Sequence, residues 1–207
     1  MIIRIHPENP EPRKIKQIVD LLNDGAVIIF PTDTVYGLGC KIDSHSAVQR
    51  ICKIKNIDPE KANLSFICAD FSKLSLYTKP FSTSHFKLLK KYLPGPYTFI
   101  LNASNDVPKL LKNKKKTVGI RIPNSPIVGE IISGLDRPLM SSSIKNLDDS
   151  DDIIEYPTDP EDIYAQYGYL VDAVIDGGVS NHHPSTIIDL TDDEPQIIRL
   201  GSGIWNE

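Results

Sequence analysis

The sequence has few of the features that would indicate a secreted, membrane-bound or disulfide-linked protein. Its three cysteines, Cys40, Cys52 and Cys68, are an odd number without paired spacing, which indicates reduced thiols in the cytosol. No apolar run approaches the roughly 18 residues that a membrane span needs. The N-terminus also lacks the apolar core of a signal peptide. We therefore expect a cytoplasmic protein that does not associate with a membrane.

The sequence also lacks the common motifs of metal, dinucleotide and serine-hydrolase sites. His182 and His183 are adjacent, so they cannot share one helical face as paired metal ligands usually do. There is no Gly-x-Ser-x-Gly elbow. A P-loop or a dinucleotide fingerprint would need more glycines at fixed offsets. We expect no metal site built by the protein itself.

What the chain does have is the balance of an ordinary folded domain. Its 207 residues are 40% hydrophobic and 24% charged, which suits one domain with a substantial core. The acidic segment 148–152 is most simply a solvated loop. The net charge of −4 argues against broad, non-specific nucleic-acid binding, although it leaves room for a local basic face.

Strand and helix patterns alternate along the chain. Apolar residues at helical spacing predict helices that begin near Pro12, Ser44, Ser82 and Ile127. Short apolar runs predict strands at residues 2–5, 26–30, 64–68, 97–101, 118–122, 138–140, 170–175, 186–190 and 197–200. This alternation predicts one α/β (α+β) domain, with helices packed on a twisted, open, mixed sheet.

The first candidate site is the segment Pro31–Gly39, which follows the buried strand 26–30. Its hydroxyls can donate to an anion, and its two glycines let the backbone approach a ligand. Ligands of open α/β sheets commonly bind where such strands end. A plain strand-turn-strand explains the same residues equally well.

The second candidate is Arg121, which lies within the apolar strand 118–122. An unpaired guanidinium is costly in such a place, so Arg121 either faces solvent or binds a carboxylate or phosphate. The serines Ser141–Ser143 follow a short strand and can either cap a helix or hold phosphate oxygens. The segments 93–98, 185–189 and 199–201 are weak signals when each is taken alone.

Lysines form a further feature of the sequence. One group lies near Lys55, and a second group occupies residues 109–116 and includes Lys112, Lys114, Lys115 and Lys116. The second group is most simply a solvated face, and its alternative interpretation is contact with RNA phosphates. Aromatic residues that would stack on unpaired bases are missing there.

Taken in order, these segments resemble those of the YrdC-like family, the threonylcarbamoyladenylate synthases. The resemblance covers residues 13–203 and rests on the segments 31–39, 93–96, 119–123, 141–143, 185–190 and 199–201. It implies the YrdC-like fold, in which a twisted open sheet flanked by helices surrounds a positively lined cavity. We expect the short, single-domain form of this family.

The resemblance also implies a reaction. Synthases of this family condense ATP, L-threonine and bicarbonate into threonylcarbamoyl-AMP and pyrophosphate, with Mg²⁺ carried by the nucleotide. The product feeds the threonylcarbamoyl-adenosine modification of tRNA. Because the threonine carbamate itself attacks the α-phosphate, catalysis depends on positioning and on cations around the phosphates.

Residue roles follow from the resemblance, position by position. Thr32 and Arg121 would hold the threonine, with the Arg121 fork on its carboxylate. Lys55 and Arg121 are the electrostatic candidates for catalysis. The residues implied to face the nucleotide are Lys55, Ser143 and Arg199, and those implied to line the rest of the pocket are Ser141 and Ser185.

Two departures place the chain with the YciO-type branch. Synthases usually carry Lys-x-Arg where this chain has Lys55-Asn56-Ile57, and Ser-x-Ser-x-Asn where it has residues 141–145 with Asn146 one place late. Hydrogen bonds to charged groups are worth about 1.5–3 kcal/mol each. Losing two would lower rate or binding roughly 10²–10⁴-fold.

Three functions remain open at this point. The first is a nucleotide-binding protein with weak threonylcarbamoyl-AMP synthesis. The second is a diverged enzyme that acts on threonylcarbamoyl-modified adenosine in tRNA, with RNA contacts from residues 109–116. The third is a non-catalytic module that binds double-stranded RNA.

Overall fold

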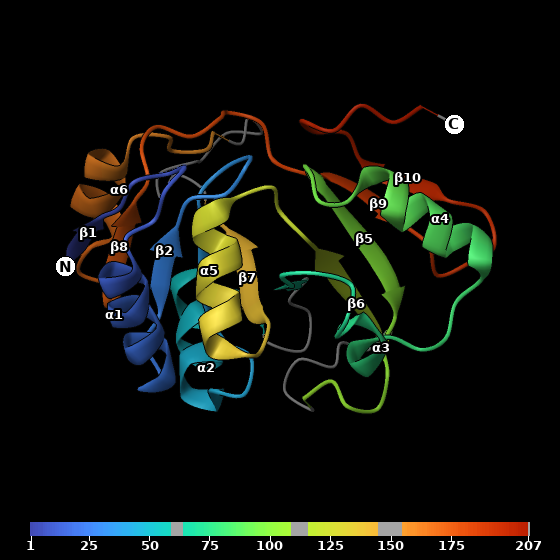
Figure 1. Cartoon of the computed structure of the whole chain (residues 1–207), viewed down its shortest axis with the longest axis horizontal. Coiled ribbons are helices and arrows are strands. Elements are labelled where there is room, and N and C mark those ends of the chain that lie inside the picture. The colour runs from blue at the N-terminus through green and yellow to red at the C-terminus, as the bar shows by residue number, and fades with distance from the viewer. Residues whose placement is uncertain (59–63, 109–115, 145–154, 207) are drawn as a thin grey trace.

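The computed structural model describes residues 1–58, 64–108, 116–144 and 155–206. One sheet runs through the whole molecule, and helices cover parts of both faces (Figure 1). In chain order the elements are β1 (Ile2–Arg4), α1 (Pro12–Asn23), β2 (Ile28–Phe30), β3 (Gly37–Lys41), α2 (His45–Ile54), β4 (Ser65–Ile67), α3 (Leu74–Tyr77), α4 (Thr83–Tyr92), β5 (Tyr97–Asn102), β6 (Thr117–Arg121), α5 (Pro126–Leu135), β7 (Leu139–Ser143), α6 (Pro160–Tyr167), β8 (Ala173–Asp176), β9 (Thr186–Asp189) and β10 (Gln196–Arg199).

The ten strands found in the described residues form one mixed sheet in the order β1-β8-β2-β3-β7-β4-β6-β5-β9-β10. Four neighbouring pairs are parallel: β1 with β8, β2 with β8, β4 with β6, and β5 with β9. The other five pairs are antiparallel. The open, mixed sheet that the sequence predicts is confirmed.

Helices α1 and α5 pack side by side on one face of the sheet (Figure 1). Helix α1 begins with Pro12, whose missing N–H costs nothing in a first turn. The chain leaves this helix through Gly25 at φ +88°, a backbone conformation that glycine adopts without strain. Ile18 and Leu22 are fully buried under this helix, as their helical spacing predicts.

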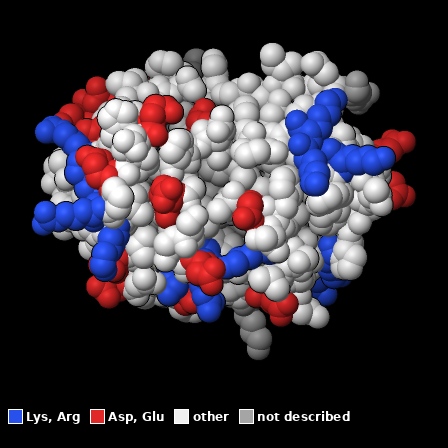
Figure 2. All heavy atoms as spheres, in the orientation of Figure 1, with Lys and Arg blue, Asp and Glu red and all other residues white. Residues whose placement is uncertain are grey.

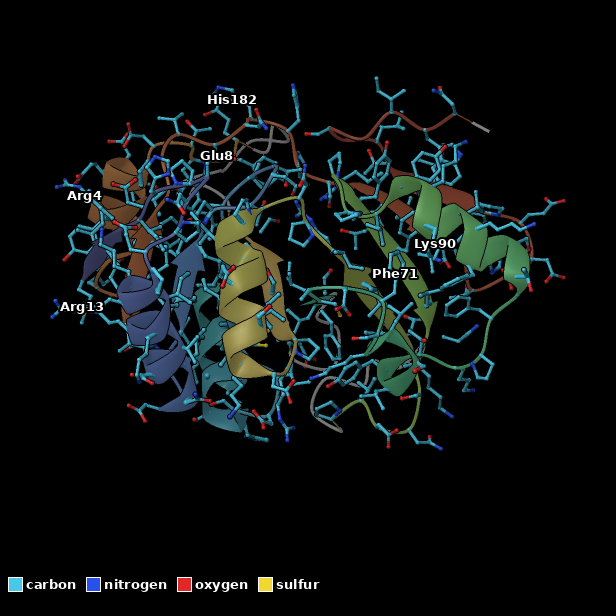
Figure 3. All side chains as sticks on the ribbon, viewed as in Figure 1. Arg4, Glu8, Arg13, Phe71, Lys90 and His182 are labelled. Carbon is cyan, nitrogen blue, oxygen red and sulfur yellow. The ribbon has the colours of Figure 1, made fainter. Side chains whose placement is uncertain are left out.

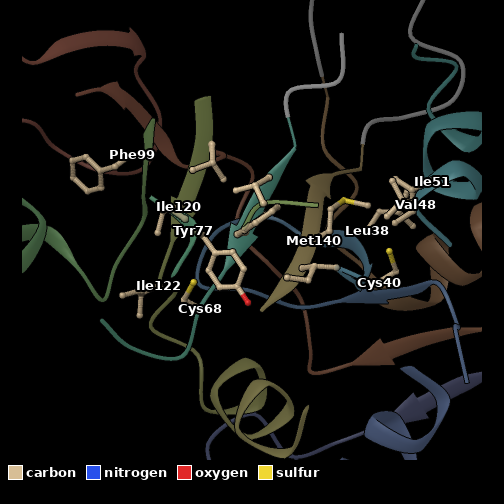
Figure 4. Close-up of a cluster of buried hydrophobic side chains, with 14 of the residues drawn as sticks. Leu38, Cys40, Val48, Ile51, Cys68, Tyr77, Phe99, Ile120, Ile122 and Met140 are labelled. Carbon is tan, nitrogen blue, oxygen red and sulfur yellow. The ribbon is translucent and has the colours of Figure 1, made fainter. Parts of the chain in front are cut away.

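Helices α2, α3, α4 and α6 pack on the opposite face, over a larger apolar core. Figure 4 shows Phe99, Ile120 and Met140, from three different strands, spread along this core, and all three are fully buried. Each such side chain contributes about 1.5–3 kcal/mol relative to an exposed position. Cys40 and Cys68 lie in the same core as free thiols, so the prediction of unpaired cysteines is confirmed.

Several local expectations need correction. Ser44 stands at the N-cap of α2, but its side chain accepts no capping hydrogen bond, whereas Ser82 accepts one from the N–H of His85. The three serines at 141–143 lie inside β7 rather than after a strand. The sequence reasoning also missed α3, α6 and β3, because α3 is a single turn and β3 is rich in glycine.

Among the described residues, no helix combines the length and apolar character needed to cross a membrane. The same part of the chain contains no cluster of three or more His, Cys, Asp or Glu residues that could hold a metal ion. The acidic segment 148–152 lies outside the described residues.

Candidate functional site

A pocket lies at the centre of the sheet, where strands from both of its halves meet. It encloses about 570 Å³ of empty space, part of which opens to solvent. The residues that line it are Thr32, Val35, Tyr36, Gly37, Ser65, Ile67, Thr98, Arg121, Ser141, Ser142, Ser143, Pro184, Ser185, Ile187 and Arg199.

The floor of the pocket is made of small residues on neighbouring strands. Ser65 on β4 lies opposite both Ser141 on β7 and Gly119 on β6. A Cβ atom at Gly119 would come within 2.8 Å of the Ser65 Oγ, and one at Gly37 within 3.1 Å of the Ser141 Oγ. Because side chains stay short here, the sheet face stays open to a ligand.

The segment Pro31–Gly39 forms a tight turn between β2 and β3. The Thr32 hydroxyl donates to the carbonyl of Val35 at 2.7 Å and accepts from the N–H of Thr34 at 3.1 Å. Asn181, which is distant in sequence, stabilises the turn, because its backbone N–H donates to the carbonyl of Thr34 at 3.0 Å. The segment is therefore a strand-turn-strand, and four of its residues also line the pocket.

Arg121, at the end of β6, points into this turn rather than to solvent. Its Nη2 donates to the Asp33 carboxylate at 2.5 Å, to Thr34 Oγ1 at 2.8 Å and to Thr32 Oγ1 at 3.1 Å. The arginine is only 8% exposed, and its Nε has no hydrogen-bond partner among the described residues. Burial lowers the pKa of Arg121, and the Asp33 carboxylate partly offsets that effect.

Arg199, on β10, lies on another side of the same pocket. Its Nη2 donates to the carbonyl of Ser185 at 2.7 Å, and its Nε donates to the same oxygen at 3.2 Å. The Ser185 hydroxyl in turn lies 2.9 Å from the hydroxyl of Thr98 on β5. Burial lowers the pKa of Arg199, and the positive charge of Arg121 lowers it further.

Charge in the pocket is therefore unbalanced. The described lining residues include two arginines and no carboxylate, and Asp33 behind the lining is already paired with Arg121. Two partly desolvated guanidiniums that repel each other are stabilised by a ligand that brings negative charge. The described lining therefore favours an anionic ligand over a cationic one.

Most of the site residues predicted from the sequence line this pocket. The six that do so are Thr32, Arg121, Ser141, Ser143, Ser185 and Arg199. Lys55 does not, but its Nζ donates to the carbonyl of Ser143 from the end of α2. Lys116 is exposed, whereas Lys112, Lys114 and Lys115 lie outside the described residues, as do Lys145 and Asn146.

Ile57 stands where the resemblance leads one to expect an arginine. Its side chain is partly buried against the larger apolar core and is not among the residues that line the pocket. At this position the chain therefore makes an apolar contact with the core and contributes no guanidinium to the pocket.

Sequence reasoning missed three contributors to the pocket: Ser65, Ile67 and Pro184. Ser65 and Ile67 were assigned to a strand, but a strand residue gives no local sign of whether its face lines a pocket. The available signal was Gly119, whose lack of a side chain marks close approach of a neighbour within a strand.

The fold and the pocket together define the class of protein: an α/β protein whose central pocket is lined by small residues and two arginines. Residues 20–201 match the Sua5/YciO/YrdC family, which is described as "Telomere recombination". The chain belongs to this family.

Relatives from both branches of the family resemble the chain. It is 41% identical to the "Uncharacterized protein YciO" of Escherichia coli over 96% of this chain and 94% of that protein. The crystal structure of E. coli YciO has a TM-score of 0.90 and covers 99% of this chain and 97% of its own. The threonylcarbamoyl-AMP synthase of Vibrio vulnificus is 32% identical over 90% of this chain and 98% of the synthase.

A third relative was crystallised with a ligand. The Sua5 protein of Pyrococcus abyssi, complexed with L-threonine, has a TM-score of 0.86 and 30% identity, and covers 97% of this chain. This chain spans 57% of that longer protein.

Proposed function

We propose that the pocket binds an adenine nucleotide together with L-threonine, and that the protein forms threonylcarbamoyl-AMP slowly from ATP, L-threonine and bicarbonate. The observation that carries the proposal is the pair of arginines, Arg121 and Arg199, around a lining without a carboxylate. Threonine bound to a Sua5 relative and the synthase name of the Vibrio relative support the choice of ligands.

In this proposal each arginine binds a different ligand. Arg121 and the hydroxyl of Thr32 would hold the threonine carboxylate, since they already share a hydrogen bond at 3.1 Å. Arg199, Ser143 and Lys55 would face the phosphates of ATP. Ser141 and Ser185 would complete the polar wall between the two ligands.

The reaction needs no covalent bond to the protein. An oxygen of the threonine carbamate attacks the α-phosphorus of ATP and forms a new P–O bond. The bond from that phosphorus to the bridging oxygen breaks, and pyrophosphate leaves with the electron pair. The described lining has no carboxylate for a metal, so Mg²⁺ would be held by the phosphate oxygens of the nucleotide.

A low rate follows from what stands at Ile57. An arginine that reached the phosphates would add a planar, bidentate donor, and Lys55 supplies a point charge without that geometry. The side chain of Ile57 packs against the apolar core instead. We expect the chemical step to be slower by about 10²-fold or more, at about 1.4 kcal/mol per tenfold.

The test is to follow threonylcarbamoyl-AMP and pyrophosphate in purified protein supplied with ATP, L-threonine, bicarbonate and Mg²⁺. The Arg199→Gln variant should lose product formation. Arg137→Gln is the matched control, because Arg137 is 54% exposed and forms an exposed ion pair with Asp43 away from the pocket. The Ile57→Arg variant should gain rate.

Each outcome of this experiment decides something. Slow, threonine-dependent product that disappears in Arg199→Gln supports the proposal. Product at an ordinary enzymatic rate means that Ile57 does not limit the reaction. If the wild type makes no product but still binds ATP, the pocket serves a different reaction. If neither ATP nor threonine binds, the proposal is wrong.

A further inference from the structure

A second cavity, unrelated to the first pocket, opens between α3 and α4. It is a groove with about 850 Å³ of empty space, and apolar side chains make up most of its lining. Three of these are phenylalanines: Phe71, Phe81 and Phe86. The rings of Phe71 and Phe86 meet edge to face, with their centroids 6.0 Å apart. Phe86 is 37% exposed, although the helical pattern would place it in the core.

The groove lies in the most basic stretch of the described chain. Residues 71–105 contain five lysines and no Asp or Glu, in a protein whose net charge is −4. Lys79 lines the groove, and Lys87 and Lys90 project from α4 beside it. Figure 2 shows positive side chains gathered over α4, with an uncharged surface on one side and acidic side chains at the outer edge.

These lysines are available to a ligand. Lys79, Lys87 and Lys90 are exposed, and they form no ion pair with the described residues. The Nζ of Lys90 rests 5.0 Å from the centre of the Phe86 ring. Figure 3 labels Lys90 on α4 and Phe71, which precedes α3 in the chain. When a base stacks on the Phe86 ring, it displaces the Lys90 ammonium group, which can then bind a phosphate.

We propose that the α3–α4 groove binds single-stranded RNA. The ring of Phe86 is exposed and those of Phe71 and Phe81 are partly exposed. Accessible rings beside cations are the features by which proteins hold unpaired nucleotides, because bases stack on the rings and phosphates bind the lysines. The exposed hydroxyls of Ser75 and Thr83 lie in the same lining and can bond a ribose 2′-hydroxyl, the group that separates RNA from DNA.

The alternative ligand for this groove is an acidic protein segment, which also combines negative charge with apolar groups. The three rings favour planar bases over the aliphatic anchors of an amphipathic helix. The proposal does not depend on the proposed synthase activity, because none of the groove residues lines the central pocket.

The experiment measures the fluorescence anisotropy of a labelled 12-nucleotide oligouridylate with the full-length protein at several salt concentrations. The Lys87→Ala/Lys90→Ala variant should lower the slope of log affinity against log salt by about 1.4, at about 0.7 per phosphate contact. The Phe86→Leu variant keeps an apolar side chain but removes the ring, and should bind about tenfold more weakly or worse.

Controls separate this surface from general charge effects. The Lys14→Ala/Lys16→Ala variant removes the same number of lysines from α1, outside the groove, and should bind RNA as the wild type does. Threonylcarbamoyl-AMP formation, measured on the same variants, should not change. A loss of RNA binding without a loss of synthesis therefore tests the groove alone.

Four results would overturn the proposal. They are wild-type affinity in both groove variants, equal or tighter binding of a 12-base-pair RNA duplex, equal binding of oligothymidylate, and displacement of the RNA by poly-L-glutamate at equal charge. The last two would assign the groove to DNA or to an acidic protein segment. Weakened binding confined to the groove variants, with a preference for the single RNA strand, supports it.

Discussion

The Asp33→Asn substitution keeps the shape of the side chain but removes the negative charge that faces Arg121. Both partners are nearly buried, with side-chain exposures of 9% for Arg121 and 12% for Asp33. One oxygen of Asp33 binds Arg121 Nη2, and the other accepts the N–H of Asn124 at 3.1 Å. The substitution therefore leaves a buried guanidinium without a counter-charge.

The expected loss of stability is large because water cannot replace the carboxylate. Removing one partner of a buried ion pair costs about 3–5 kcal/mol. Arg121 cannot compensate through its other donors, since its Nε already lacks a hydrogen-bond partner among the described residues. For a chain of this size, about 1 kcal/mol lowers the melting temperature by roughly 2–4 °C. The melting temperature should therefore fall by about 6–20 °C.

Urea denaturation and thermal melting of the two proteins measure this effect directly. Asp43→Asn is the matched control: Asp43 also faces an arginine, Arg137, but the pair is exposed and 3.4 Å long. That substitution should cost less than about 1 kcal/mol. The double variant Asp33→Asn/Arg121→Met should lose less than Asp33→Asn alone, because removing both charges leaves no unpaired ion.

A loss below about 1 kcal/mol in Asp33→Asn would refute the reasoning, because that is the range of an exposed pair. A double variant less stable than Asp33→Asn would also contradict it. In that case Arg121 would stabilise the fold through its contacts with Thr32 and Thr34 rather than through charge.

Three further predictions concern other parts of the chain. Burial raises the pKa of Cys40 and Cys68 to about 12. Both thiols should therefore resist a thiol reagent at neutral pH until the protein is unfolded, and rapid labelling of the native protein would contradict this. Gly129→Ala should stabilise α5 by about 0.5–1 kcal/mol in denaturation, since nothing lies within 4 Å of the added Cβ, and a loss would show hidden crowding. The Lys14 side chain and a backbone N–H lower the pKa of Glu11 from 4.5 to about 2. The contribution of Glu11 to stability is therefore present above pH 4.5 and disappears as the pH falls toward 2. The Glu11→Gln variant should lack this acid-dependent part, and identical pH profiles of stability for the two proteins would contradict the prediction.

Much of the architecture was accessible from local patterns. The helical spacing of Ile15, Ile18, Val19 and Leu22 predicted α1 together with its buried face, and Pro12 and Gly25 marked its ends. The apolar run at residues 26–30 predicted a strand buried on both faces, and β2 is fully buried. Such patterns are local because a helix or strand repeats over a few residues, whatever the rest of the chain does.

The candidate site was only partly accessible in this way. Polar residues at 31–39, 121 and 141–143 could be singled out as unusual within apolar strands. Whether Arg121 met solvent or a carboxylate could not be decided, because its partner Asp33 is 88 residues away in sequence. The groove at α3 and α4 was not singled out at all, since its rings and lysines come from separate segments.

The sequence by itself determined the elements, their buried faces and the supply of arginines, hydroxyls and glycines. Only the tertiary structure decided that Gly119 would lie beside Ser65 and that Arg199 would reach Ser185 across the sheet. The physical reason is that strand register depends on which apolar faces pack together over long distances, and a slip of one residue would turn each polar side chain away from the pocket.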